Sequence, residues 1–188
     1  NPDVTRKLRA LWTLHVTQGI AENELVALLD HSYEYVRSWA IQLLTEDKTV
    51  TQATLERFAS MAKNDNSALV RLYLVSGLLR LEPAKRWEVL AALVQKTEDV
   101  ADHNLPLMLW YATEPLAILD TERAIKMVEK AKTPKLLDYT IQRVGAINSV
   151  ASKKSLEALR GRLGKINSNE SQYYQAKIDS LINNTGTK

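Results

Sequence analysis

Two matching stretches decide the fold: Val36-Arg37-Ser38-Trp39-Ala40 and, 34 residues later, Val70-Arg71-Leu72-Tyr73-Leu74. In each stretch, apolar residues recur at spacings of three and four and continue beyond it, to Leu44 in the first and Leu81 in the second. This spacing places the apolar residues on one face of a helix. The sequence contains neither sustained alternation of apolar and polar residues nor an Asn-Gly or Asp-Gly hairpin turn. We therefore predict an all-helical chain.

The helical pattern returns along most of the chain. Comparable stretches begin at Leu8, Pro106 and Leu137, so the pattern repeats roughly every 28–36 residues. Predicted partner helices lie between them, at about 22–29, 51–63, 84–96 and 120–132. Two helices per unit at this period are typical of an α-solenoid, in which each hairpin covers the apolar face of the one before it. We predict an α-α superhelix of about five stacked hairpins.

The turns ahead of the two matching stretches carry residues that resemble a known family. Asp30 precedes Arg37 by seven residues, and Asn64 precedes Arg71 by the same distance, with Asp65 next to it. This arrangement resembles the HEAT repeat over residues 1–147 and implies a HEAT/ARM-like α-solenoid. In that family the turn Asp caps a helix and pairs with the Arg of its own or the next repeat. The resemblance thus assigns Asp30 to Arg37, and Asp65 or Asn64 to Arg71.

The predicted domain organisation is a single domain with a distinct C-terminal part. Residues 1–166 form the HEAT-like helical repeats, including a helix at 152–165. Residues 167–188 form a linker, a last capping helix at about 170–183 and a disordered tail. Because the sequence begins Asn1-Pro2-Asp3, without Met or a signal peptide, we expect the chain to be an internal part of a longer protein.

The segment 99–117 departs from the repeat pattern. Pro106 is tolerated in a first helical turn with Asn104 as N-cap, whereas Pro115 predicts that the helix is short or breaks there. Glu114 occupies a core position of the repeat, so it needs a partner or an exit to water. Its candidate partners are His103, Arg71, Arg80 and backbone N–H groups of the next turn. Leu107 stands where the repeat has Arg, so we expect Arg–Asp pairing in the first half of the chain only.

This segment also resembles a longer protein class. The residues Asp102-His103-Asn104-Leu105-Pro106-Leu107-Met108-Leu109-Trp110-Tyr111, followed by Glu114-Pro115-Leu116, resemble the HEAT-repeat region of large bacterial membrane-bound dehydrogenase proteins. These have an N-terminal β-propeller, a central HEAT region and a C-terminal cytochrome c domain with a Cys-x-x-Cys-His motif. The resemblance implies a non-catalytic scaffold or protein-interaction module in the cell envelope or periplasm. Its partners are then a protein or the flanking domains of its own chain.

The composition excludes several kinds of site. With no cysteine, the sequence holds no disulfide, thiolate zinc site or c-type haem attachment. The three histidines lack metal-ligand spacing, and no phosphate-binding loop, dinucleotide fingerprint or nucleophile elbow occurs. No run of 18 apolar residues could span a membrane. We therefore expect no enzyme activity, catalytic residue, metal or cofactor in this chain, and we expect a monomer.

The structural or docking candidates lie in the repeat turns and in the segment 99–117. They are Asp30, Arg37, Asp65, Arg71, Asp102, His103, Asn104, Trp110 and Glu114. His103, beside Asp102 and with Glu114 farther along, is the best acid–base candidate, and a small enzyme using these groups is one alternative function. Capping and bracing of the Pro106 helix is the simpler interpretation of the same residues.

The aromatic residues and His15 allow two interpretations. Four tryptophans, Trp12, Trp39, Trp87 and Trp110, occupy helical positions with apolar neighbours. We expect them in the core, with a row of aromatics along a groove as the alternative. His15 falls on the apolar face of its helix and is expected to be a hydrogen-bonded core histidine.

Charge is unevenly distributed along the chain. The net charge is +3, but residues 1–120 hold 12 Lys/Arg against 16 Asp/Glu, and residues 121–188 hold 13 against 6. The second part could face an acidic partner, an anionic membrane surface or a phosphate backbone. A nucleic-acid-binding HEAT-like protein, such as a DNA glycosylase, is therefore the main alternative function. Because basic residues do not recur at matched positions through all repeats, we expect no nucleic acid.

Overall fold

The computed structural model describes residues 3–184, and this part of the chain is helical with no strand. None of its helices combines the length and apolar character that a membrane crossing requires. The prediction of an all-helical chain is confirmed. In chain order the elements are α1 (Val4–Val16), α2 (Glu22–Ala27), η1 (Leu28–Asp30), α3 (Glu34–Leu44), α4 (Gln52–Asn64), α5 (Ala68–Leu78), η2 (Pro83–Lys85), α6 (Trp87–Leu93), α7 (Leu105–Leu119), α8 (Thr121–Val128), α9 (Pro134–Ile147), α10 (Val150–Leu163) and α11 (Asn169–Asn184).

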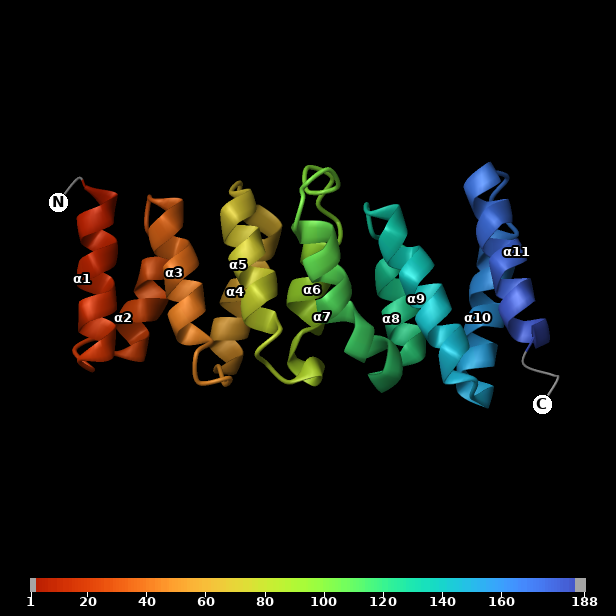
Figure 1. Cartoon of the computed structure of the whole chain (residues 1–188), viewed down its shortest axis with the longest axis horizontal. Helices are drawn as coiled ribbons and strands as arrows, with labels where there is room; N and C mark the ends of the chain where they lie inside the picture. Colours follow the sequence, from red (N-terminus) through yellow and green to blue (C-terminus); the bar gives the residue numbers. More distant parts are fainter. Residues whose placement is uncertain (1–2, 185–188) are drawn as a thin grey trace.

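The helices follow one another in a row, with α1 and α11 at opposite ends (Figure 1). The odd-numbered helices run in one direction and the even-numbered helices return in the other. Each odd-numbered helix packs against the next, from α1 on α3 through to α9 on α11. On the other side, α4 packs on α6 and α8 on α10. Contacts therefore join neighbours along the chain, and the odd-numbered helices form one continuous layer.

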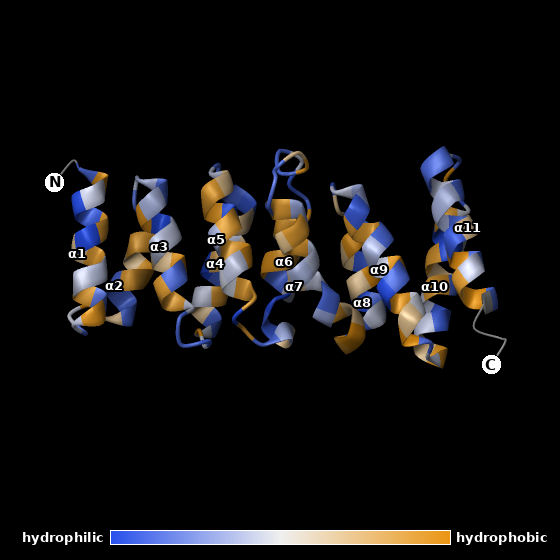
Figure 2. Cartoon of the chain, viewed as in Figure 1, coloured by the Kyte–Doolittle hydropathy of each residue, from blue (hydrophilic) through white to orange (hydrophobic). Residues whose placement is uncertain are grey.

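A single apolar cluster runs through the whole row, from Leu11 in α1 to Ile178 in α11. Figure 2 shows hydrophilic residues gathered in the loops at both edges, whereas the helices carry residues of both kinds. The contact between α3 and α5 is close at Gly77, where an added Cβ would lie 3.1 Å from Thr45 Cγ2. Burial of these faces stabilises the array by roughly 25 cal/mol per Å² of apolar surface.

The predicted break at Pro115 is wrong, because α7 continues through it to Leu119. Proline inside a helix removes one backbone hydrogen bond and costs about 3 kcal/mol. Beyond Pro115, both Leu116 and Ala117 are fully buried in the core. Their burial offsets the cost, and Pro106 lies in the first turn as predicted.

The C-terminal helix packs on α9 through buried and charged groups. The hydroxyl of Tyr174 donates to the carbonyl oxygen of Pro134 at 3.1 Å, and burial raises the pKa of Tyr174 to about 12. Lys177 Nζ lies 2.5 Å from Asp138 Oδ1. The helix continues to Asn184, one residue beyond its predicted end at 183, and the rest of the predicted tail, 185–188, lies outside the described residues.

Candidate functional site

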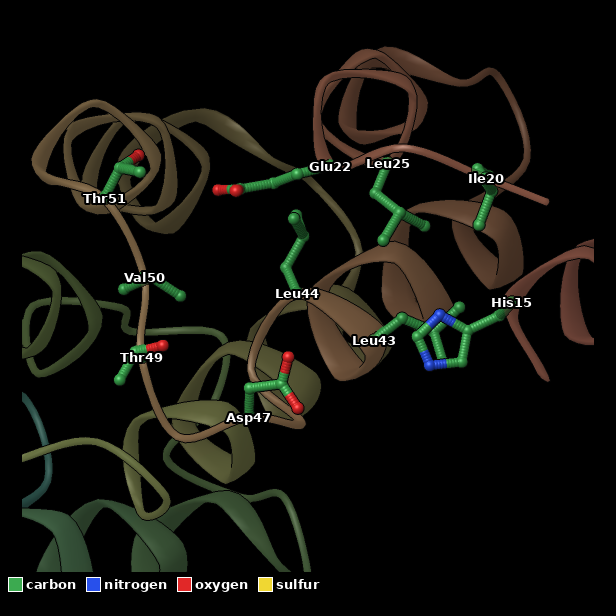
Figure 3. A pocket seen from close by; sticks show the side chains of 10 residues that line it. All are labelled: His15, Ile20, Glu22, Leu25, Leu43, Leu44, Asp47, Thr49, Val50 and Thr51. Carbon is green, nitrogen blue, oxygen red and sulfur yellow. The ribbon is translucent and has the colours of Figure 1, made fainter. Parts of the chain in front are cut away.

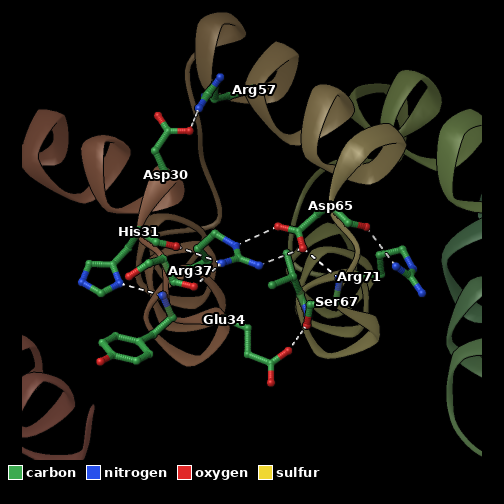
Figure 4. Close-up of polar contacts among 11 residues, drawn as sticks. Asp30, His31, Glu34, Arg37, Arg57, Asp65, Ser67 and Arg71 are labelled. Carbon is green, nitrogen blue, oxygen red and sulfur yellow. Dashed lines mark hydrogen bonds and ion pairs between the residues drawn. The ribbon is translucent and has the colours of Figure 1, made fainter. Parts of the chain in front are cut away.

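Arg37 joins two successive turns at one edge of the row (Figure 4). Its Nε and Nη2 donate to the carboxylate of Asp65 at 2.8 and 2.9 Å. Its Nη1 donates to the carbonyl oxygens of His31 and Ser32 in the turn before α3. The bidentate geometry is the strong form of an Arg–carboxylate interaction. One side chain thus fixes the turn before its own helix to the turn before the next.

Arg71 repeats this arrangement one unit later and is buried. Its Nε and Nη2 donate to the Asp99 carboxylate at 2.6 and 2.5 Å, and its Nη1 donates to the Asp65 carbonyl oxygen at 3.0 Å. Arg71 is 1% exposed and Asp99 is 2% exposed. The bond to Asp99 raises the pKa of Arg71, so the guanidinium is held as a buried cation. We call Arg37–Asp65 and Arg71–Asp99 the two Arg–Asp clamps.

The predicted pairing of Asp30 with Arg37 is wrong. Asp30 lies at the end of η1 and pairs with Arg57 of α4 instead (Figure 4). Arg37 points away from Asp30 because the turn between them offers it carbonyl oxygens, and its carboxylate partner comes from the next turn. The Asp65 carboxylate pairs with Arg37, whereas Arg71 bonds to the Asp65 backbone carbonyl oxygen.

Asp99 was missed, although the sequence held a signal for it. In both clamps the Asp follows the Arg by 28 residues. Once Arg37 is paired with Asp65, the same separation from Arg71 leads to Asp99.

Ion pairs between neighbouring helices also occur in the second half, but they do not continue the turn-to-turn ladder of Arg–Asp clamps, so the expected limit of that ladder is not contradicted. Arg143 of α9 pairs with Glu114 of α7, and Arg162 of α10 pairs with Glu129 at 2.9 and 2.8 Å. The Glu114 and Arg143 side chains are about one-third exposed, so Glu114 has both a partner and contact with water. None of the partners predicted for Glu114 is the one it has.

The start of α7 is capped by the side chain of Asp102 and not, as expected, by that of Asn104. Asn104 stands at the N-cap position, but its side chain makes no capping bond. The Asp102 carboxylate accepts from the backbone N–H groups of Asn104 and Leu105, both at 2.8 Å. These two bonds lower the pKa of Asp102, because they favour the ionised form.

Replacing the capping carboxylate should destabilise α7, whereas replacing Asn104 should not. We expect Asp102→Ala to lower the free energy of unfolding by about 1 kcal/mol, and Asn104→Ala to change it by less than about 0.5 kcal/mol. Because the folded pKa of Asp102 lies below its unfolded value, its stabilisation is present above the unfolded pKa. That stabilisation is lost as pH falls through the folded pKa. Urea unfolding at pH 7 and at acid pH measures both effects, and equal losses for the two variants would refute the assignment.

The acid–base candidates do not converge. Asp102 and His103 precede α7, whereas Glu114 lies nine residues beyond Leu105, about 14 Å along the helix axis. His103 is exposed, and Glu114 is paired with Arg143. Within residues 3–184 no group of acidic and histidine side chains could hold a metal ion. The structure therefore does not bring His103 and Glu114 together, as an enzyme that used both side chains would require.

A hollow at the opposite edge collects a second set of polar groups (Figure 3). It has a volume of about 430 Å³, with Leu25, Leu43 and Leu44 among its apolar walls and His15, Glu22 and Asp47 among its polar ones. His15 contacts Glu46, with Nε2 2.5 Å from Oε2, and its side chain is 27% exposed. The predicted hydrogen bond of His15 is therefore present, but its predicted core position is wrong, because the first helix has a neighbour on one side only. Glu22 and Asp47 are exposed carboxylates that point into the hollow from different elements.

Much of the basic charge of the second half is engaged locally. Six basic side chains lie in ion pairs with carboxylates of the same region or of α6 and α7. They are Arg123, Lys126, Arg143, Arg160, Arg162 and Lys177. Pairing reduces the charge that could neutralise phosphates, so the geometry does not favour the nucleic-acid alternative.

Comparison of the chain with models of protein families, with curated proteins and with solved structures found no match.

Proposed function

We propose that the chain is a HEAT-like α-solenoid that acts as a non-catalytic scaffold and protein-interaction module. The observation that carries this proposal is the pair of Arg–Asp clamps. Both join successive turns at a separation of 28 residues, and both bind a backbone carbonyl of the turn before their own helix. A clamp that repeats with the helices is what a stack of equivalent units needs to hold a constant geometry.

The scaffold works by fixing distances. Neighbouring units are held by apolar packing through the whole row and by ionic contacts at one edge. Whatever is bound at one end or along one face is thereby kept at a set separation from the other end. Residues 99–117 resemble the HEAT-repeat region of bacterial membrane-bound dehydrogenase proteins. On this basis the proposal places the chain between a dehydrogenase-like propeller and a cytochrome in the cell envelope.

Truncation tests the repeat architecture. In a stack, stability is a sum of local terms, so removal of the terminal unit should leave the rest folded. We expect the chain 1–147, which ends with α9, to keep the helical circular dichroism of α1–α8 and to unfold at lower urea concentration. Loss of helical signal throughout the truncated chain would contradict the proposal, because a fold with one shared core unfolds as a whole.

A further inference from the structure

The first helix is lightly held for its length. Among the described residues of α1, which has 13 residues, Leu11 is the only buried one, whereas α3 buries five of its 11 residues. Its main packing partner is α3, on one side. A helix that buries so little apolar surface opens at a low cost in free energy. A few polar contacts can therefore decide whether α1 stays docked.

An aromatic pair and an ionic pair join the middle and the end of α1 to α3. The ring of Trp12 meets the ring of Trp39 edge-on, with the centroids 4.7 Å apart. Near the end of α1, His15 contacts the carboxylate of Glu46. Protonation of His15 gives this pair opposite charges, so acid strengthens the contact at this end of the helix.

The beginning of α1 meets His31, in the turn before α3. Lys7 Nζ lies 3.3 Å from His31 Nε2 and 4.8 Å from the centroid of the Tyr33 ring, on which the imidazole stacks. The other ring nitrogen, Nδ1, accepts from the backbone N–H of Tyr33 at 3.0 Å. The imidazole lies on the side of its turn away from Asp65 (Figure 4). His31 thus lies between the turn and the ammonium group of α1.

This geometry suits the neutral form of His31 and not the imidazolium. With Nδ1 as acceptor, the hydrogen of the neutral ring lies on Nε2, so the cation–π contact with Tyr33 holds Lys7 in place. A second proton would make Nδ1 a donor that faces another donor, and would set two positive charges side by side. Burial lowers the pKa of His31, and the charges of Lys7 and Arg37 lower it further.

The carboxylates around this turn already have partners. They are Asp30 with Arg57, Glu34 with Ser67, Asp65 with Arg37 and, in α1, Asp3 with Arg6. Arg37 donates to the carbonyl oxygen of His31 and belongs to α3, so it stays beside His31 whether or not α1 is docked. Lys7 is therefore the cation that docking of α1 brings to His31.

We infer that α1 is an acid-released end helix: protonation of His31 separates its beginning from the turn before α3 and uncovers the face of α3 that includes Trp39. Docking of α1 favours neutral His31, so it is strongest above the pKa of His31 in the released state. It weakens as pH falls through the lower pKa of the docked state. Because His15 acts in the opposite sense, the helix opens from its Lys7 end. This release does not depend on what the array binds.

Hydrogen exchange of the full chain at about pH 7.5 and about pH 5.5, corrected for the intrinsic pH dependence of exchange, tests the release. We expect protection of α1 to fall about threefold or more at the lower pH relative to α9. In His31→Asn the side-chain oxygen can still accept the N–H two residues on but does not titrate, so protection should stay at its higher value. His103→Asn, at an exposed histidine of another turn, is the matched control and should behave as the parent chain does.

Lys7→Met provides a second measurement, because it removes the charge and keeps most of the stem. Titration of the imidazole signals by nuclear magnetic resonance should show His31 protonating at higher pH in this variant than in the parent chain. Three outcomes contradict acid release. These are an equal fall of protection in α1 and α9, the parent's pH dependence in His31→Asn, and an unchanged titration of His31 in Lys7→Met.

Discussion

Asp99→Ala should lower the free energy of unfolding by about 3–5 kcal/mol, because it leaves the Arg71 guanidinium buried without its carboxylate. Arg71 is 1% exposed, and its other acidic neighbour, Glu98, is half-exposed and 3.8 Å away. Water cannot replace the lost hydrogen bonds without opening the turn. Urea unfolding at pH 7 measures the loss.

An exposed ion pair provides the control for this prediction. The Glu88 and Arg123 side chains are 79% and 50% exposed, so Glu88→Ala should cost less than about 1 kcal/mol. The double variant Arg71→Met/Asp99→Leu removes both charges from the interior and should recover most of the stability lost in Asp99→Ala. A loss below about 1 kcal/mol for Asp99→Ala would show that the clamp does not hold the units together.

Phe58→Ala should destabilise one region of the row strongly and leave the far end unchanged. Phe58 of α4 is 1% exposed, and removing a buried Phe costs about 3–5 kcal/mol. In a stack of units, this loss is confined to neighbours of the cavity. Hydrogen exchange should therefore show faster opening of amides in α3–α6 and unchanged protection in α10.

The control for this variant lies on the same helix. Glu56 of α4 is exposed, so Glu56→Ala should change protection by less than about 0.5 kcal/mol anywhere in the chain. If Phe58→Ala lowered protection equally in α4 and α10, the helices would form one cooperative core and not a series of units.

Helices and their order could be predicted from the sequence, because apolar spacing reports which face of each segment is buried. Val36 and Val70 show this most clearly, since both are buried where the pattern placed them. The prediction failed at Pro115, where the burial of the following residues offsets the cost of proline inside a helix. Rules based on local sequence give the cost of a proline inside a helix, but they do not include the tertiary packing that compensates for that cost.

The candidate site could be predicted only in part. The sequence identified Arg37, Asp65 and Arg71 as structural residues but paired them in the wrong register, because the nearest carboxylate along the chain is not the nearest in space. Glu114 was recognised as needing a partner, yet Arg143 lies 29 residues later on another helix. Of the four tryptophans expected in the core, Trp87 is buried, Trp39 and Trp110 pack against the core but are partly exposed, and Trp12 is exposed at the end of the row.

The central claim is that the row of helices holds a fixed distance between its ends. Because the chain has no cysteine, spin labels can be placed at Thr13→Cys in α1 and Gln172→Cys in α11 without background. Both positions are exposed. A control pair, Gln142→Cys and Gln172→Cys, lies in the neighbouring helices α9 and α11. It gives the width of the distance distribution that the labels themselves cause.

Double electron–electron resonance measures the distance between these labels. For five steps between odd-numbered helices, we predict a single peak at about 40–50 Å, little wider than that of the control pair. A broad or multiple distribution between Thr13→Cys and Gln172→Cys, with a narrow control, would contradict the account.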